Sequence, residues 1–287
     1  MRSHPLKKHN WVTDLIARFY CRRRDRRHAY ALYDYFRTLD DYVDDPGIPR
    51  RDKTEYLRRQ YTLIRGLYQD GKAADTDPIA EVVRYDCRHG LRLEPNILRM
   101  FRVFDFDEAR GGHTVTRQEL AAYSRDLALS YLGIFLNFIE PRYQFNEDDI
   151  QLAYGCHQAH MLRDHFVDLS IGYINLADEE MREYGIRPGG HVEPGFRNWV
   201  RQKVREIEGC LTRGKERVMS APFLKVKLAA FLYCFRYEVV LRRLKESDYL
   251  LSADYPVRAR DLIRLAAVLL GISAGHVSGK FRRRSLS

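Results

Sequence analysis

The sequence lacks a long apolar run of the kind that crosses a membrane. A spanning helix needs roughly 18 or more predominantly apolar residues, and the two best candidates, around Leu127–Ile139 and Leu265–Val277, are shorter. Both runs are therefore predicted to form buried helices. The first residues, MRSHPLKKHNWV, are basic but contain no apolar segment typical of secretion. These absences predict a cytoplasmic protein.

Cysteine is too scattered to form a framework. The chain has five cysteines, an odd number with no CxxC pair, at positions Cys21, Cys87, Cys156, Cys210 and Cys234. Disulfide scaffolds and zinc sites need closely and regularly spaced cysteines. The pattern predicts free thiols in a reducing compartment.

Strand-like alternation is also nearly absent, and helical spacing dominates the chain. Prolines separate the helical stretches, and 45% hydrophobic content in 287 residues is ample for a large core. The sequence predicts one all-α domain over residues 1–287, with flexible tails at 1–10 and 275–287. The predicted helices are Trp11–Arg24, His28–Asp45, Lys53–Tyr68, Pro78–His89, Pro95–Phe104, Arg117–Ile139, Asn146–Ile171, Ala177–Tyr184, Gly195–Met219, Pro222–Leu250 and Val257–Leu270.

Positive charge is in excess, because 49 basic and 39 acidic residues give 49 − 39 = +10. This balance fits nucleic acid, a membrane surface or an anionic small molecule as partner. Two arginine runs, Arg22–Arg27 and Phe281–Arg284, carry no interleaved aromatic residues or recognisable nucleic-acid motif. We expect no nucleic-acid binding and at most peripheral membrane contact.

Aspartates gather at the end of one predicted helix. Asp40 and Asp44, like Asp41 and Asp45, are four residues apart and share a helical face. Like charges at this spacing repel, and acid at a helix C-terminus opposes the helix dipole. Local stability therefore does not explain the cluster.

A second pair, Asp164 and Asp168, repeats the spacing on an apolar helix, where an unpaired carboxylate would be costly. Two such faces opposite each other would offer oxygen ligands to Mg²⁺, which also binds substrate phosphates. Arg37 and Arg163 accompany the two pairs, and Tyr33 precedes Arg37 by one turn. The alternative is a solvated helix end and a set of aspartate–arginine ion pairs.

These residues occur in two recognisable strings. YALYDYFRTLDDYVDD, from Tyr30 to Asp45, resembles the first aspartate-rich motif of the squalene and phytoene synthase family, and LRDHFVDLSIGYINLADEEMREYGI, from Leu162, resembles the second. Weaker similarity at Tyr123 and near Tyr237 and Tyr249 extends the likeness over most of the chain.

The resemblance implies an isoprenoid-synthase helical bundle around a central cavity. It implies a prenyltransferase in which two or three Mg²⁺ ions, replaceable by Mn²⁺, help a prenyl diphosphate to ionise. Carried onto this chain, it assigns catalysis and metal binding to Asp40, Asp44, Asp164 and Asp168 with support from Asp41, and diphosphate binding to Arg37, Arg163 and Tyr33.

Three departures from the family pattern bear on the reaction. The usual Gln-x-x-Asn before the second motif is His157 and His160 here, and imidazole is a poor Mg²⁺ ligand. The usual Gly-Arg-x-Tyr after it reads Gly172-Tyr173-Ile174-Asn175, which removes one cation. The segment LALSYLGIFL places Leu129 and Tyr131 where small residues would leave room for a long prenyl chain.

These departures predict that the donor half-site is kept and that a short prenyl cation passes to another acceptor. A small aromatic molecule of secondary metabolism is expected, as in the phytoene-synthase-like enzymes that prenylate carbazoles. The acceptor pocket would include His157, His160, His165, Leu129 and Tyr131, and an imidazole would orient the acceptor or take its proton. The alternative is head-to-head condensation of two prenyl diphosphates; cyclisation or a non-catalytic role are further alternatives. The sequence leaves the oligomeric state open.

Overall fold

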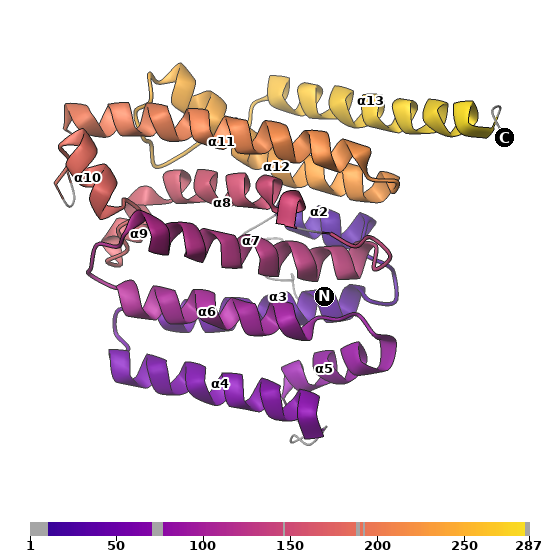
Figure 1. Ribbon diagram of the computed structural model, residues 1–287, viewed down its shortest axis with the longest axis horizontal. Coiled ribbons are helices and arrows are strands. Elements are labelled where there is room, and N and C mark those ends of the chain that lie inside the picture. The colour runs from indigo at the N-terminus through magenta and orange to yellow at the C-terminus, as the bar shows by residue number, and fades with distance from the viewer. Residues whose placement is uncertain (1–10, 71–76, 146, 188–189, 192, 285–287) are drawn as a thin grey trace.

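Helices make up almost all of the regular structure. The computed structural model describes residues 11–70, 77–145, 147–187, 190–191 and 193–284; within them the β-type pairing is a single bridge between Val115 and Ala177. The all-α class is therefore confirmed. The elements in Figure 1 are α2 (Trp11–Phe19), α3 (Arg26–Asp44), α4 (Arg50–Asp70), α5 (Pro78–His89), α6 (Glu94–Arg110), α7 (Arg117–Ile139), the short 3₁₀ helix η1 (Glu147–Ile150), α8 (Gln151–Arg163), α9 (His165–Ser170), α10 (Asp178–Tyr184), α11 (Pro194–Ser220), α12 (Leu224–Glu246) and α13 (Ala259–Arg284).

Local sequence signals set the ends of several helices. At the start of α7, the Thr116 hydroxyl accepts from the Glu119 backbone N–H, and the Glu119 carboxylate accepts from the Thr116 backbone N–H. This reciprocal cap satisfies two donors that a helix start leaves unpaired. At α5, Asp77 caps the helix start and Gly90 ends the helix with a φ of 61°. Both helices have the bounds that the sequence predicts.

The stretch 146–171, predicted as one helix, is broken. After η1, α8 ends at Arg163, and Asp164 leaves helical geometry with φ −95° and ψ 8° before α9 begins. The backbone N–H of Asp168 still donates to the Asp164 carbonyl over 2.8 Å. Asp164 and Asp168 therefore remain one helical turn apart despite the break. Asn146, the predicted start, lies outside the described residues.

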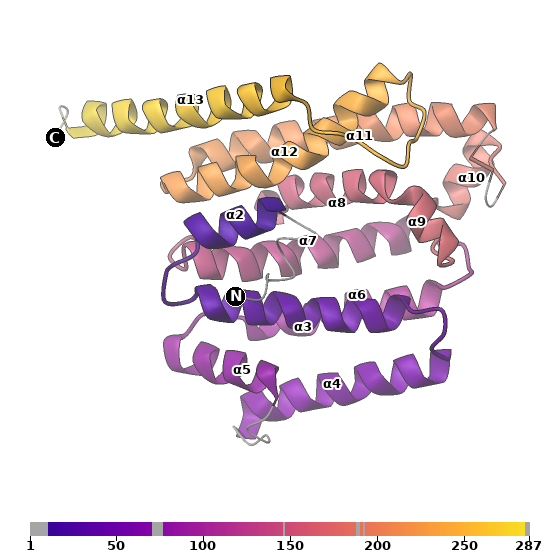
Figure 2. The same cartoon turned by 180° about the vertical axis from the view of Figure 1, so that it is seen from behind.

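The helices lie in successive layers, which Figures 1 and 2 show from opposite sides. At one edge are α4 and α5, followed by α3 with α6, α7 with α2, α8, α11 with α12, and finally α13. One buried cluster draws mainly on α2 to α7, and another on α8 and α10 to α12.

Close packing of α6 on α7 depends on Gly133. A Cβ at this position would lie 2.4 Å from the Asn96 amide oxygen of α6. Ser130, one turn earlier, donates from its hydroxyl to the Asn96 carbonyl over 2.6 Å. This approach lets Tyr123 of α7 donate to Asp107 of α6 over 3.2 Å, and both side chains face the cavity described below.

The last helix departs most from prediction. The sequence predicts a buried helix ending near Leu270 and a flexible tail from residue 275, but α13 continues to Arg284. Its segment Ala259–Ser278 has the length and mean hydropathy (1.4) of a membrane span, and only 11% of it is buried. An apolar helix is buried only where another layer covers it, and α13 packs mainly against α12. The other predicted tail, residues 1–10, lies outside the described residues.

Candidate active site

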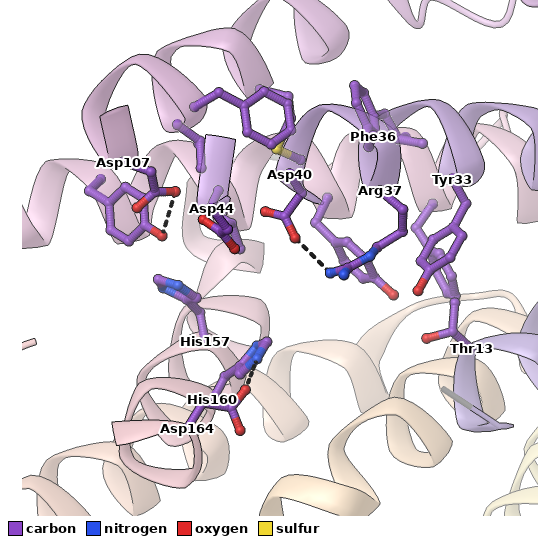
Figure 3. A pocket seen from close by; sticks show the side chains of 18 of the residues that line it. Thr13, Tyr33, Phe36, Arg37, Asp40, Asp44, Asp107, His157, His160 and Asp164 are labelled. Carbon is purple, nitrogen blue, oxygen red and sulfur yellow. Dashed lines mark hydrogen bonds and ion pairs between the residues drawn. The ribbon is translucent and has the colours of Figure 1, made fainter. Parts of the chain in front are cut away.

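A cavity of about 450 Å³ lies among α2, α3, α6, α7 and the α8–α9 segment (Figure 3). Part of its wall is polar, and the rest is apolar. The polar residues include Thr13, Tyr33, Arg37, Asp40, Asp44, Asp107, Arg110, Tyr123, Tyr131, His157, His160, Asp164, Asp168 and Tyr173. The apolar residues include Ala17, Leu32, Phe36, Met100, Phe104, Leu127, Ile134, Phe135 and Phe138.

The first aspartate cluster divides between cavity and solvent. Asp40 and Asp44 line the cavity, one turn apart on α3. Asp41 points outward with a side chain 66% exposed, and Asp45 lies just past the end of α3, where its carboxylate accepts from the Gly47 backbone N–H. The helical period thus selects one of the two predicted pairs for the site.

Arg37 and Tyr33 lie on the cavity side of α3. The Arg37 guanidinium donates to Asp40 over 2.6 Å and also to Asp41. Figure 3 shows Arg37 beside Asp40 and Tyr33 one turn away. These contacts place a cation directly beside the first carboxylate pair.

The second aspartate pair also lines the cavity, so the structure brings all four predicted cavity aspartates to one space. Asp164 is already engaged there. Arg163 donates to its two oxygens over 2.6 and 2.5 Å, and His160 Nε2 lies 2.6 Å from Oδ2. Arg163 and Asp164 therefore bind each other. This is the aspartate–arginine ion pairing that the sequence offers as the alternative to a Mg²⁺ site.

Asp107 is a further carboxylate that the sequence analysis missed. It lies on α6, is 7% exposed and lines the same cavity. Its bond from Tyr123 and its ion pair with Arg110 hold it there. The available signal was the Asp-x-x-Arg spacing of Asp107 and Arg110 in the string FRVFDFDEAR.

Arg110 joins the elements of the site. It donates to Asp107 over 2.9 Å and to the Asn175 side-chain oxygen over 2.7 Å, and Asn175 in turn donates to Asp168 over 2.5 Å. Its guanidinium carbon lies 4.5 Å from the ring centroid of Tyr173. Arg110 is only 5% exposed. A buried cation thus stands next to the position where the family motif would carry arginine.

The carboxylates are electrostatically strained. Burial raises the pKa of Asp40 and of Asp168 to about 7, and the neighbouring charges of Asp44 and Asp164 add to this effect. Burial raises the pKa of Asp107 to about 6, although Arg110 opposes the shift. The pKa of Asp44 is raised by burial too, against the bond from Tyr173. Protons or cations are therefore needed to balance the charge of this cavity.

Asp164 behaves differently. Burial acts to raise its pKa, but the bonds from Arg163 and His160 outweigh burial and hold the pKa well below its usual range. Protein groups therefore already balance the charge of Asp164.

The donor set suits Mg²⁺ bound together with a phosphate ligand. In the described part of the chain, no three carboxylate, imidazole or thiol groups converge into a metal site built of protein alone. Mg²⁺ keeps several waters and is usually held by one or two carboxylates plus substrate phosphates. Paired carboxylates with raised pKa values fit that mode.

Two of the three predicted histidines reach the cavity. His157 is 5% exposed, and burial lowers its pKa to about 3; its Nδ1 has no hydrogen-bond partner among the described residues. His160 pairs with Asp164. His165, by contrast, packs against Phe196, with ring centroids 5.1 Å apart, in the cluster of α8 and α10 to α12. The prediction that His165 lines the pocket is wrong.

The side of α7 that lines the cavity differs from the prediction at one residue. Tyr131 lines the cavity, whereas Leu129, two residues earlier on the helix, does not. Tyr131 stacks on Phe135 and on Tyr233 of α12, with centroid separations of 5.4 and 5.0 Å. These three residues also line an apolar void of about 40 Å³ toward α12. We call this stack of Tyr131, Phe135 and Tyr233 the aromatic partition.

Comparison with known proteins agrees with this geometry. The squalene/phytoene synthase family model matches residues 8–261. A dehydrosqualene synthase in complex with ligand superposes with a TM-score of 0.73 at 18% identity, covering 95% of this chain and 94% of that one. Squalene synthase HpnC from Alicyclobacillus acidocaldarius superposes with a TM-score of 0.68 at 18% identity, covering 86% and 93%. A search among curated proteins finds no match.

At this identity the two structures establish the fold, and the family match over most of the sequence establishes the relationship. The cavity lined by both aspartate pairs is the feature that the two family motifs imply. The chain belongs to the squalene/phytoene synthase family and is an enzyme of the prenyltransferase type.

Proposed function

We propose that this chain is a Mg²⁺-dependent enzyme that transfers one short prenyl group from an allylic diphosphate to a small aromatic acceptor. The observation that carries the proposal is the aromatic partition, which bounds the cavity at about 450 Å³. This volume is in the lower part of the roughly 300–1,000 Å³ range of small-molecule sites. It suits one short prenyl chain and a compact acceptor better than two long prenyl chains.

The polar wall would bind the donor. Asp40, Asp44 and Asp168 would hold Mg²⁺, joined by Asp164 when Arg163 exchanges that carboxylate for the more highly charged diphosphate. The bound metal would supply positive charge that stabilises the departing diphosphate. Arg37 would donate to diphosphate oxygens beside Asp40, and Tyr33 would line the same region.

The residues that line the cavity would then support ionisation of the donor and transfer of its prenyl group. The allylic C–O bond breaks, and its electron pair leaves with the diphosphate. Aromatic faces such as Phe36, Phe104 and Phe138 exclude water from the cation and stabilise it through their π electrons. A ring carbon of the acceptor then forms the new C–C bond and loses its proton.

The two cavity histidines divide the acceptor roles. A pKa of about 3 makes His157 a weak base, so its unpaired Nδ1 serves to orient the acceptor by hydrogen bonding. Burial lowers the pKa of His160 as well, but Asp164 binds its Nε2 and opposes that shift. His160 is therefore the residue that we assign to take the proton.

Head-to-head condensation of two prenyl diphosphates is the second candidate. The family match and the dehydrosqualene and squalene synthase neighbours favour it. It requires space for two prenyl chains and cations for two diphosphates. Arg37 and Arg110 are cations that line this cavity, and Arg110 is already committed to Asp107.

Release of diphosphate separates the two candidates. The purified chain is incubated with dimethylallyl, geranyl or farnesyl diphosphate, with and without Mg²⁺, and with and without carbazole as an aromatic probe. We expect Mg²⁺-dependent release that rises when carbazole is present. Rapid release without any acceptor, together with a coupled hydrocarbon product, would support head-to-head condensation and reject the proposal.

A further inference from the structure

Arg236 of α12 is a cation without a carboxylate partner near the cavity. Its guanidinium carbon lies 5.2 Å from the ring centroid of Tyr237, and no ion pair joins it to an acidic side chain in the ranges that the structure describes. The side chain is half-buried, and its neighbours Phe235 and Tyr237 are buried. A cation among apolar groups costs free energy unless an anion balances it. We therefore expect the counter-charge to come from a bound ligand.

Other arginines near the cavity are already paired. Each donates to a neighbouring carboxylate: Arg37 to Asp40, Arg110 to Asp107 and Arg163 to Asp164. These cations offset the charge of the aspartates, where the donor diphosphate and Mg²⁺ are proposed to bind. Arg236 differs from them because its positive charge is not offset by a described carboxylate.

The place of Arg236 on α12 directs it toward the acceptor part of the cavity. It follows Tyr233 of the aromatic partition by three residues, so the two side chains share a face of the helix. Tyr233 stacks on Tyr131, which lines the cavity. The ring of Tyr237, over which the guanidinium lies, has its centroid 6.2 Å from that of His160. Arg236 thus lies behind two residues that we assign to the acceptor.

The charge of Arg236 acts on three groups that line the cavity. Burial raises the pKa of the Tyr33 and Tyr131 hydroxyls, and Arg236 is among the groups that oppose both shifts. Burial lowers the pKa of His160, and Arg236 adds to that shift. These three residues belong to α3, α7 and α8, and Figure 3 shows Tyr33 and His160 reaching into the cavity from different helices. Arg236 therefore lies close to the space that these helices enclose.

An acidic group on the acceptor fits this position best. The donor diphosphate is expected beside Arg37, together with Mg²⁺, whereas Arg236 flanks His160 and Tyr131. A guanidinium binds a planar carboxylate through two parallel hydrogen bonds. An aromatic acid would therefore supply both a ring for the acceptor pocket and the counter-charge that Arg236 lacks.

We propose that Arg236 binds a carboxylate on the acceptor, so that the preferred acceptor is an aromatic acid. This inference rests on the proposed transfer to an aromatic acceptor and narrows its substrate class. The guanidinium turns from the Tyr237 ring toward the cavity and holds the carboxylate, while the aromatic ring of the acceptor lies against Tyr131 and His160. Arg236 determines which acceptor binds and takes no part in proton transfer.

The binding of an acid and of its neutral amide tests the proposal. The full chain, with Mg²⁺ and inorganic diphosphate present, is titrated calorimetrically with indole-3-carboxylate and with indole-3-carboxamide, which have nearly the same shape. We expect the parent to bind the acid at least about tenfold more tightly than the amide. Arg236→Met should abolish this preference. Arg236→Lys should keep part of it, because an ammonium group retains the charge but not the paired hydrogen bonds.

The matched control is Arg205→Met. It removes one positive charge from an exposed position of α11 that does not line the cavity. This variant should keep the full preference for the acid. Circular dichroism and Tm establish that each variant is folded.

Three results would overturn the proposal. The first is a parent that binds the acid no more tightly than the amide, and the second is an Arg236→Met variant that keeps the preference. The third is an Arg236→Met variant that loses as much affinity for inorganic diphosphate alone as for the acid, which would assign Arg236 to a diphosphate. The titration involves no turnover, so a chain that prefers the acid but transfers no prenyl group would count against the proposed function alone.

Discussion

Tyr173 donates a hydrogen bond from its hydroxyl to Asp44 over 2.9 Å, and so ties the loop after the second aspartate pair to the first pair. The guanidinium of Arg110 lies over the same tyrosine ring. At the position where the family motif carries arginine, this chain therefore has a tyrosine that positions a carboxylate, and the positive charge comes from α6 instead.

Removal of Arg110 tests its part in this network. We expect Arg110→Met to lower the free energy of unfolding by about 3–5 kcal/mol, because Asp107 would remain buried without its cation. Arg102→Met, on the same helix, removes an exposed ion pair with Asp126 and should cost about 1 kcal/mol or less. Urea denaturation measures both. Equal losses in the two variants would show that Arg110 is not a structural centre of the site.

The cavity aspartates can be compared with an outward-facing neighbour. Asp40→Asn should lower Mg²⁺-dependent release of diphosphate by about a hundredfold or more, since it removes a carboxylate from the metal-binding wall. Asp41→Asn changes a side chain that is 66% exposed and should reduce the rate less than about fivefold. Steady-state release of diphosphate measures both rates. A similar loss in both variants would contradict the assignment of Asp40 to the site.

The raised pKa of Asp40 predicts a pH dependence of stability. Its pKa rises from 3.8 to about 7 in the folded chain, so the folded state holds this proton more tightly than the unfolded state. The stability that this proton contributes is complete below about pH 4 and is lost as the pH rises toward 7. Asp40→Asn removes the loss.

We therefore compare Tm values of the parent and Asp40→Asn in metal-free buffer. The difference in Tm should grow in favour of the variant between about pH 5 and 7, because only the parent loses the Asp40 proton over this range. The buried histidines titrate in both proteins, so their contributions cancel. Adding Mg²⁺ near pH 8 should raise the Tm of the parent more than that of the variant. A Tm difference that does not change with pH would refute the raised pKa.

The aromatic partition makes a prediction about donor length. Tyr131→Ala should open the cavity toward the neighbouring void and raise the farnesyl-to-geranyl ratio of kcat/KM by about tenfold. Leu129→Ala, which does not line the cavity, should leave the ratio unchanged. Competition between the two donors measures this ratio directly. No change in Tyr131→Ala would mean that the partition does not limit chain length.

Helical periodicity was the most useful signal in the sequence. It paired Asp40 with Asp44 and Asp41 with Asp45, and the structure turns the first of these pairs to the cavity. It remained useful at Asp164 and Asp168 because the break between α8 and α9 keeps these two residues one turn apart. Such spacing depends on local backbone geometry, which sequence encodes well.

Features that depend on neighbouring helices were not predictable in this way. Asp107 and Arg110 join the site because Gly133 lets α7 approach α6. Tyr131 and Leu129 are two residues apart, so they point in very different directions from one helix, and the sequence does not give the rotation of α7. The apolar run of α13 predicted burial, but only 11% of it is buried among the described residues.

The identity of the product tests the central claim most directly. The full chain is supplied with Mg²⁺, deuterium-labelled geranyl diphosphate and carbazole, and the products are analysed by mass spectrometry. The account predicts a product that contains one labelled prenyl group attached to carbon of the acceptor, with one diphosphate released per product. A hydrocarbon that contains two labelled prenyl groups and no acceptor atoms would contradict it.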